Sequence, residues 1–303
     1  MINKKLKEQI MLDFRIITFL SVCRHMNFTY AAEELHITQP AVSQHIRFLE
    51  EHYGEKLFER DGKKIKLTPA GKILKATMTV INDDEASIIS RIQNSAKERQ
   101  SLKIGVTLTI GEYVIANPLS KYIKNHPETD IRIYFANTAE LSKMLTEGKL
   151  DIAVVEGNFN SDLFESYIYK SEEYIPVCSS AHKFAKKVKL LTDLLPERLI
   201  VRESGSGTRD ILEKNLEARN VSVSDFFNIT EAENIHLIVN LVKQDCGITF
   251  LYKAAVEEEI KNGNLREISL DDFSIQHNFT FIWNRGSVFA PEYRQISNEF
   301  INA

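Results

Sequence analysis

The sequence predicts an α/β protein built from two unlike parts, since a chain of 303 residues usually forms two or three domains. Three observations support this fold class. Two short capped helical patterns and an Asp-Gly hairpin fill the region before residue 68. A helical pattern without Gly or Pro follows, from Lys72 to about Lys97. After Gln100, short apolar strands alternate with helices, which is typical of a doubly wound sheet.

The composition is that of a folded protein, with 43% hydrophobic and 26% charged residues. No run approaches the length of a membrane span, and the first ten residues lack the apolar stretch of an export signal, so we expect a cytoplasmic protein. The three cysteines are far apart and odd in number, which argues against disulfides and a zinc site. We expect Cys23, Cys178 and Cys246 to be buried.

The net charge of −4 is unevenly distributed along the chain. Residues 1–100 hold sixteen Lys or Arg against thirteen Asp or Glu, a net of +3, which leaves −7 for the remaining 203 residues. Residues 56–75 alone have seven basic and two acidic side chains, a net of +5. Such a patch suits phosphate, although a solvated charged face would be the better interpretation if the patch stood alone.

The first helices are predicted from caps and apolar spacing. Apolar residues at spacings of three and four predict a helix over Leu12–Cys23. Thr29 is predicted to cap a short helix, and Thr38, with Pro40 in the following turn, a second helix that ends at Gly54. Two short helices joined by a brief turn and packed on a preceding helix form a helix-turn-helix.

The outward face of the second helix carries side chains that can reach base edges. Gln suits adenine and Arg suits guanine, and the polar residues on this face are Gln39, Ser43, Gln44 and Arg47. Short polar residues are common on exposed helices, so this face alone is weak evidence.

A basic hairpin strengthens the interpretation. Asp61-Gly62 is a turn signal between two short strands, and Arg60, Lys63 and Lys64 near the tip suit a phosphate backbone. Thr68 with the proline after it repeats the capping pattern and predicts the start of the long helix.

The segment Phe28–Ile46, together with Leu49-Glu50, Gly54, Leu57–Arg60 and Leu67–Gly71, closely resembles the N-terminal domain of LysR-type transcriptional regulators. The resemblance implies a winged helix-turn-helix DNA-binding domain over 1–68, a linker and dimerisation helix over 69–100, and an effector-binding domain over 101–303. It implies these DNA-binding residues: Thr29, Thr38, Gln39, Pro40, Ser43, Gln44, Arg47, Arg60, Lys63, Lys64 and Thr68.

The same resemblance implies several partners. These are double-stranded promoter DNA, RNA polymerase, and further copies of the chain in a dimer or tetramer, and the regulator is expected to be an activator. The apolar positions Ile73, Leu74, Met78, Ile81 and Ile88 suit a seam between paired linker helices, although periodicity alone fits an ordinary core helix as well. Residues 1–10 precede the usual family opening, and Met11 could serve as the initiator.

The second part alternates strands with helices. Strands are expected at 102–107, 131–136 and 151–155, with helices at 111–125 and 140–147 between them, which predicts βαβ units on a parallel sheet. Further strands are expected at 174–179, 199–202, 226–229, 248–251 and 279–283. Segments 150–156 and 247–251 look like effector-domain strands of the same family. That likeness implies two lobes, as in periplasmic binding proteins: lobe one at 101–168 and 278–303, lobe two at 169–277.

The expected ligand site lies at the carboxyl ends of the strands, where α/β folds bind ligands. Three such ends carry polar residues, namely Thr107 with Thr109, Asn137 with Thr138, and the segment Arg202-Glu203-Ser204-Gly205-Ser206-Gly207-Thr208-Arg209. Its two glycines allow close backbone approach, its hydroxyls can donate, and the helix that follows offers free N–H groups to an anion. A tight turn with ordinary caps explains the same residues equally well on spacing alone.

Gly-Ser-Gly-Thr-Arg at 205–209 is similar to a loop of sulfur-assimilation regulators, which implies a small anionic effector, such as a sulfur oxyanion, a small carboxylate or a sulfonate. No hydrolase, phosphate-loop or zinc-enzyme motif occurs, so we expect no enzyme, no catalytic or metal residue and no cofactor. The alternative function is that of a solute-binding protein without DNA activity. The N-terminal motif and the missing signal peptide argue against it.

Overall fold

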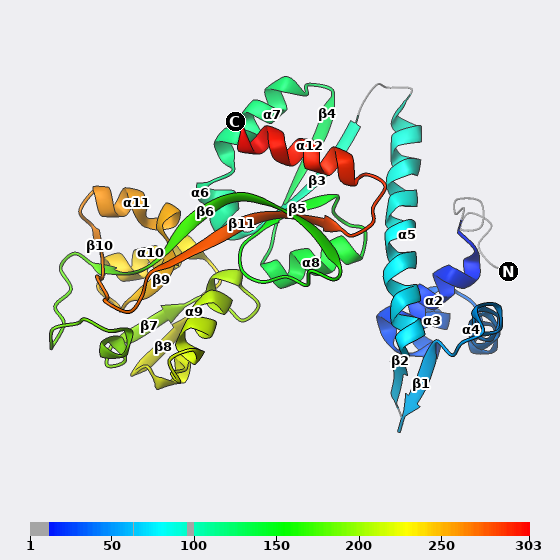
Figure 1. The fold of residues 1–303 in the computed structure, drawn as a ribbon, viewed down its shortest axis with the longest axis horizontal. Helices are drawn as coiled ribbons and strands as arrows, with labels where there is room; N and C mark the ends of the chain where they lie inside the picture. The colour runs from blue at the N-terminus through cyan, green and yellow to red at the C-terminus, as the bar shows by residue number, and fades with distance from the viewer. Residues whose placement is uncertain (1–11, 63, 96–99) are drawn as a thin grey trace. The chain divides into compact units, whose positions relative to one another are not determined.

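The computed structural model describes residues 12–62, 64–95 and 100–303. The chain divides into two compact units, Met1–Gln93 and Asn94–Ala303, each described here by itself (Figure 1). Within the described residues, no helix is both long and apolar enough to cross a membrane.

The first unit, called here the winged unit, packs four helices and a hairpin around one core. Phe19, Val22 and Val42 are fully buried in this core, and Leu57 joins it from the start of the hairpin. Its elements are α2 (Phe14–His25), α3 (Phe28–Glu34), α4 (Gln39–Tyr53), β1 (Phe58–Asp61), β2 (Lys64–Leu67) and α5 (Pro69–Ser95).

The cap of α4 is confirmed and that of α3 is corrected. Thr38 Oγ1 accepts from the Ala41 N–H at 3.3 Å, with Pro40 in the first turn. The cap of α3 is Asn27, whose Oδ1 accepts from the Thr29 and Tyr30 N–H groups at 2.8 and 3.2 Å. Thr29 is therefore inside the first turn. Asn and Thr are both favoured at the N-cap, and the structure uses Asn27, two positions before the predicted Thr29.

The hairpin turn lies one residue later than the Asp61-Gly62 expectation. The strands pair with Asp61 opposite Lys64, so the turn begins at Gly62, which adopts a left-handed φ of 61°. Lys63 lies outside the described residues, and so does Lys97, the expected end of the long helix.

The second unit, called here the α/β unit, is built on a mixed seven-stranded sheet and a separate two-stranded one. The large sheet has the order β10-β6-β11-β5-β3-β4, with β9 added on β6, and the small one pairs β7 with β8. The strands are β3 (Gln100–Val106), β4 (Thr129–Phe135), β5 (Ile152–Val155), β6 (Phe164–Ser179), β7 (Arg198–Val201), β8 (Asn228–Glu231), β9 (Thr249–Tyr252), β10 (Leu265–Glu267) and β11 (Ile275–Asn284).

Helices cover these sheets, and two short 3₁₀ turns lie at Leu191–Leu194 and Val223–Asp225. The helices are α6 (Leu108–Tyr113), α7 (Ala116–Asn125), α8 (Thr138–Thr146), α9 (Gly207–Glu217), α10 (Ile235–Lys243), α11 (Lys253–Lys261) and α12 (Ala290–Ile301). We use "lobe one" for β3–β5, α6–α8 and α12, and "lobe two" for β7–β10 and α9–α11. The long strands β6 and β11 run through both lobes (Figure 1), and the expected lobe boundaries at 168 and 277 fall inside them.

The expected parallel sheet is found only in part. β3 is parallel to β4 and β5, and β7 is parallel to β8. β11 is antiparallel to both of its neighbours, β5 and β6, because it brings the chain back from lobe two to lobe one.

The single helix expected over 111–125 is two helices, α6 and α7. Pro118 has no N–H to donate to the carbonyl of Val114, so one continuous helix cannot cross this point, whereas the first turn of α7 tolerates the proline. The expectation of three buried cysteines is wrong at one position. Cys23 and Cys178 are buried, but Cys246 is exposed.

Candidate functional site

The reading face of α4 is accessible in the winged unit. The side chains of Gln39, Gln44 and Arg47 are exposed and that of Ser43 is half-buried, with Gln39 Nε2 donating to Ser43 Oγ at 2.9 Å. The opposite face buries Val42, Ile46 and Leu49 in the core. Thr29, Thr38 and Pro40 are also exposed, so this surface is free to meet a groove.

Contacts with α2 fix the position of α4. Thr18 Oγ1 donates to the Phe14 carbonyl and lies 2.9 Å from His45 Nδ1. The Arg15 guanidinium lies 3.5 Å from the centre of the Phe48 ring. Burial of the ring, followed by the charge of Arg15, lowers the pKa of His45.

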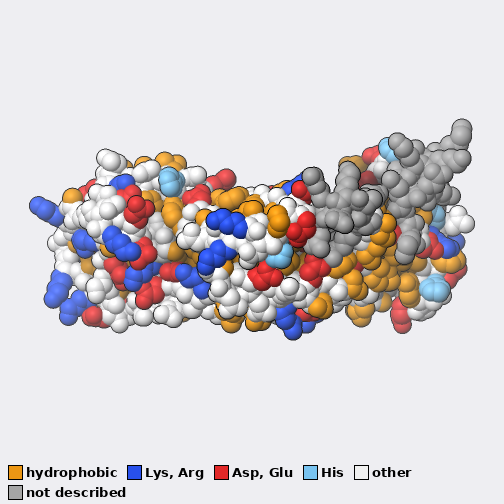
Figure 2. Space-filling view, turned by 90° about the horizontal axis from the view of Figure 1, so that it is seen from above, with side chains coloured by type: hydrophobic (Ala, Val, Ile, Leu, Met, Phe, Trp, Pro, Cys, Tyr) orange, Lys and Arg blue, Asp and Glu red, His pale blue; other side chains and the backbone are white. Residues whose placement is uncertain are grey.

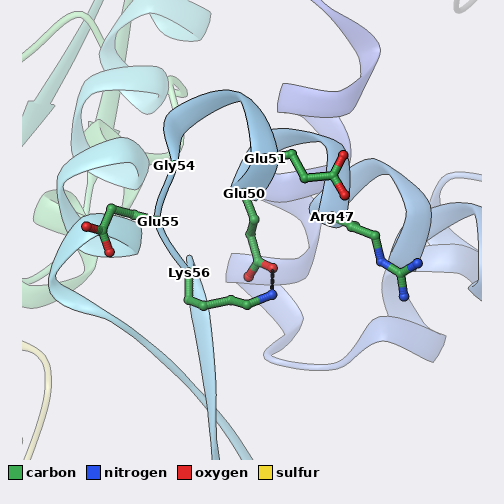
Figure 3. Close-up of a pocket in the computed structure, with 6 residues that line it drawn as sticks. All are labelled: Arg47, Glu50, Glu51, Gly54, Glu55 and Lys56. Atoms are coloured by element: carbon green, nitrogen blue, oxygen red, sulfur yellow. Dashed lines mark hydrogen bonds and ion pairs between the residues drawn. The ribbon is translucent and has the colours of Figure 1, made fainter.

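Glu50 joins α4 to the hairpin; it is part of the family resemblance but was not among the predicted site residues. Its Oε1 accepts from the Leu57 N–H at 3.0 Å, and its Oε2 accepts from Lys56 Nζ at 2.6 Å (Figure 3). The surface hollow in that figure is lined by Arg47, Glu50, Glu51, Gly54, Glu55 and Lys56. Three carboxylates against two cations make this hollow unsuited to phosphate, so its role is to connect the helix with the hairpin.

The basic side chains of the hairpin that the structure describes are accessible. Arg60 and Lys64 are exposed on neighbouring strands. Thr68 has a structural role, since its Oγ1 donates to the Lys56 carbonyl at 2.5 Å and accepts from the Gly71 N–H at 3.0 Å, which caps α5.

In the α/β unit, a buried carboxyl group connects the two lobes. Glu156 follows β5 in lobe one and is only 2% exposed. Its Oε1 accepts from Thr109 Oγ1 of lobe one at 3.1 Å and from Thr208 Oγ1 of lobe two at 2.6 Å. Two of the hydroxyls that we expected around a ligand therefore meet at one oxygen of this residue. The sequence signal that could have identified Glu156 is its position as a single acidic residue directly after a fully buried strand.

Four buried polar atoms, one of them the second oxygen of this carboxyl, have no hydrogen-bond partner among the described residues. They are Thr107 Oγ1, Glu156 Oε2, Arg202 Nη1 and Ser206 Oγ, and each side chain is at most 3% exposed. They come from the ends of β3, β5 and β7 and from the start of α9. Because buried polar groups in proteins are nearly always hydrogen-bonded, these atoms are available to a polar ligand.

Arg202 and Glu203 form an ion pair beside this group. Arg202 Nε and Nη2 donate to the Glu203 carboxylate at 2.7 and 2.9 Å, which leaves only Nη1 unpartnered. Asn137 Nδ2 donates to the same carboxylate at 3.5 Å, while its Oδ1 caps α8 through the Glu140 N–H. Thr138 Oγ1 donates to the backbone carbonyl of Glu156 at 2.5 Å.

The two glycines of the 205–209 segment have different surroundings. A Cβ at Gly207 would lie 2.2 Å from the Glu156 carbonyl oxygen, so this glycine lets the backbones of the two lobes touch. Gly205 has a left-handed φ of 88° and room for a Cβ, 3.5 Å from the Cβ of Ala139. Ser204 is exposed beside it. Ser206 is the N-cap residue of α9, yet its side chain makes no capping hydrogen bond.

Burial raises the pKa of Glu156, and the hydrogen bonds from Thr208 and Thr109 and the charge of Arg202 oppose this less strongly. No three acidic, His or Cys side chains gather as metal ligands do in the described part of the chain. On the face of the α/β unit visible in Figure 2, basic and acidic side chains are interspersed. That face lacks the extended basic field that phosphate backbones attract.

Comparison with protein families gives two matches. Residues 95–300 match the model described as LysR substrate binding domain, and residues 15–72 match that of the bacterial regulatory helix-turn-helix protein, lysR family. The HTH-type transcriptional regulator CysL of Bacillus subtilis (strain 168) is 28% identical over 270 residues, which cover 88% of each chain.

Solved structures share the fold. The OxyR C206S mutant of Corynebacterium glutamicum, bound to H2O2, superposes with a TM-score of 0.60 at 23% identity, covering 95% of this chain and 91% of that one. The Synechocystis PCC6803 CcmR regulatory domain in complex with 2-PG gives 0.59 at 18% identity, covering 67% of this chain and 97% of that domain.

Proposed function

The chain belongs to the LysR family of DNA-binding transcriptional regulators, and on this premise we propose that a small anion bound between its two lobes switches its activity. The observation that carries the proposal is the set of four unpartnered buried atoms of Thr107, Glu156, Arg202 and Ser206. One of them, Ser206 Oγ, lies at the N-cap position of α9, which lacks a side-chain hydrogen bond. An anion there would accept from Arg202 Nη1, the two hydroxyls and the free N–H groups of the helix.

The proposed effector residues are those expected from the sequence, with Glu156 added. Thr107, Arg202 and Ser206 supply unpartnered donors, Ser204 is exposed next to them, and Thr109 and Thr208 orient Glu156. Asn137, Thr138, Gly205 and Gly207 shape the contact between the lobes. We propose a sulfur oxyanion, a sulfonate or a small carboxylate as the effector, and no cofactor.

A thermal-shift screen tests the anion. Sulfate, sulfite, thiosulfate, sulfonates and carboxylates of three to six carbons are added to the full chain, because a ligand of the folded state raises the melting temperature by mass action. The expected result is a concentration-dependent rise for at least one of them. Gly205→Val should weaken that binding more than Thr208→Ala, since it adds a branched side chain at a left-handed φ of 88°. Unaltered affinity of the Gly205 variant would place the site elsewhere.

For DNA, we propose that α4 lies in the major groove, with Gln39, Ser43, Gln44 and Arg47 nearest the bases. Thr29, Thr38 and Pro40 lie at the same accessible surface, Arg60, Lys63 and Lys64 contact phosphates, and Thr68 holds the hairpin on α5. A mobility-shift assay compares the full chain with a version lacking residues 12–70 on the promoter of its own gene. Equal DNA binding by the two proteins would show that the assignment of DNA binding to residues 12–70 is wrong. No DNA binding by the full chain would favour the solute-binding alternative.

We also propose that α5 pairs two copies of the chain. Leu74 and Met78 pack on the core of the winged unit, but Ile73, Ile81 and Ile88 of the same helix are 70%, 42% and 40% exposed. Three exposed isoleucines along one stripe of a helix suit a self-complementary seam.

A dimer or tetramer of this kind would read an interrupted palindrome with half-sites about one helical turn, or a multiple, apart. Light scattering that returned only the single-chain mass of 34.7 kDa would contradict this. In this proposal the regulator acts in the cytoplasm as an activator, and ligand-driven closure of the lobes changes the bend of the DNA met by RNA polymerase.

A further inference from the structure

The unpartnered oxygen of Glu156 restricts the ligand that the proposed site can hold. Oε1 accepts two hydrogen bonds and Oε2 none, although the side chain is 2% exposed. An ionised carboxylate buried next to an anion would repel it strongly, because little water screens the two charges. An anion and a bare Glu156 carboxylate therefore cannot occupy the site together.

The hydrogen bonds decide where a proton on Glu156 would be. Thr109 and Thr208 both donate to Oε1, so a neutral carboxyl group would carry its hydrogen on Oε2. That hydrogen would turn the unpartnered oxygen from an acceptor into a donor. The donor would then belong to the same group of atoms as Arg202 Nη1 and Ser206 Oγ.

The surroundings of Glu156 favour the neutral form. The positive charge that faces it is Arg202, which Glu203 largely neutralises at 2.7 Å. Tyr174 of β6 and Tyr252 of β9 lie near it as neutral phenols, since burial raises the pKa of each well above its usual value. The hydrogen bonds that Glu156 receives from helices α6, α8 and α9 come from the uncharged Thr109, Thr138 and Thr208.

We infer that Glu156 makes the effector complex a protonated one, in which a small anion binds together with one proton held between Oε2 and the ligand. The inference rests on the proposed anion site and deepens it. A fully ionised oxyanion such as sulfate takes up this proton from solvent, through the carboxyl group. Hydrogen phosphate brings a hydrogen of its own and donates it to Oε2.

Titration calorimetry on the unaltered full chain measures this proton directly. Sulfate, thiosulfate and methanesulfonate are the ionised probes, inorganic phosphate at about pH 8.5 is the hydrogen-bearing one, and each is titrated in two buffers of different ionisation enthalpy. Where the carboxyl of the unliganded protein is ionised, above its pKa, we expect uptake of about one proton per ionised anion, with the dissociation constant rising about tenfold per pH unit. Below that pKa the carboxyl is already neutral, and the uptake should fall to zero. For hydrogen phosphate we expect uptake near zero.

Glu156→Gln supplies the hydrogen permanently, because its amide can accept at Oε1 and donate where Oε2 was. This variant should bind sulfate with an affinity independent of pH, about tenfold or more above the unaltered chain at pH 8.5. The control is Glu217→Gln, an exposed position on the same helix as Thr208, which should keep the full pH dependence.

The outcomes separate the two proposals. Binding of the ionised anions with neither proton uptake nor a pH-dependent affinity at any pH, or loss of their binding in Glu156→Gln, overturns the inference alone and shows that the anion binds without a proton on Glu156. If no probe binds either protein at any pH, the anion site itself is wrong and the inference falls with it.

Discussion

Polar side chains are arranged in opposite ways in the two units. In the winged unit, the side chains of Gln39, Gln44 and Arg47 are exposed, and Gln39 donates a hydrogen bond only to the neighbouring Ser43 of the same helix. In the α/β unit, Thr109 and Thr208 point inward and share one buried carboxyl oxygen. An extended DNA surface is met by exposed side chains, whereas a small ligand needs donors that are already held in place. Substitutions of these exposed residues in the winged unit should therefore change DNA binding alone. Substitutions at the buried site of the α/β unit should change both ligand binding and stability.

The largest effect is expected at Gly207. Alanine there would place a Cβ 2.2 Å from the Glu156 carbonyl oxygen, so the backbones of the two lobes must separate. We expect a loss of about 3 kcal/mol in the free energy of unfolding of the α/β unit. Calorimetric melting of the full chain measures this.

Gly205→Ala is the matched control, since its Cβ would meet nothing closer than 3.5 Å and it bears only left-handed strain, about 1 to 2 kcal/mol. Equal losses at both positions would mean that the lobes do not meet through Gly207.

The next effect concerns binding rather than folding. Arg47→Ala should leave the melting temperature unchanged, because its side chain is exposed, and should cost about 1 to 3 kcal/mol at one base pair of the site. Lys64→Ala should instead weaken binding to all sequences and reduce the salt slope by about one unit. Mobility shifts on single-base variants of the operator distinguish the two. A uniform loss for Arg47→Ala would assign this residue to the phosphates.

The Glu156 carboxyl should make the stability of the unliganded α/β unit depend on pH. Its pKa is raised above the ordinary 4.5, so the folded state binds this proton more tightly than the unfolded state does. That stabilisation is complete below about pH 4.5 and is lost as pH rises through the folded pKa. Glu156→Gln should consequently melt higher than the unaltered chain at pH 8, with a difference that shrinks toward pH 4.5. A difference that grows as pH falls would show that the carboxyl is ionised and stabilising.

The winged unit could be predicted almost completely from the sequence. Caps, the Asp-Gly turn and apolar spacing are local signals, and the errors were a cap two residues late at Thr29 and a turn one residue early at Asp61. In the α/β unit, the polar residues at the strand ends were found, but their partner Glu156 was not. Glu156 is 47 residues from Thr109 and 52 from Thr208, and spacing along a chain does not show which groups a folded sheet brings together.

The smallest effects come from two residues that hold the same position in their helices. Thr38 and Ser206 are the N-cap residues of α4 and α9, but only Thr38 accepts a hydrogen bond from the following turn, at 3.3 Å. Thr38→Ala should destabilise the winged unit by about 1 kcal/mol. Ser206→Ala should change the stability of the α/β unit by less than about 0.5 kcal/mol, because the lost hydroxyl has no partner in the described structure.

Anion binding should reverse this order. Ser206→Ala should weaken the binding of the anion found in the thermal-shift screen by about tenfold, because it removes one hydrogen-bond donor to a charged ligand. Thr38→Ala should not change the affinity for the anion. A stability loss of about 1 kcal/mol for Ser206→Ala, with anion affinity unchanged, would show that this hydroxyl caps α9 in solution. Its unpartnered oxygen would then no longer support a ligand at this helix end, and the contrast between the two units would rest on Glu156 alone.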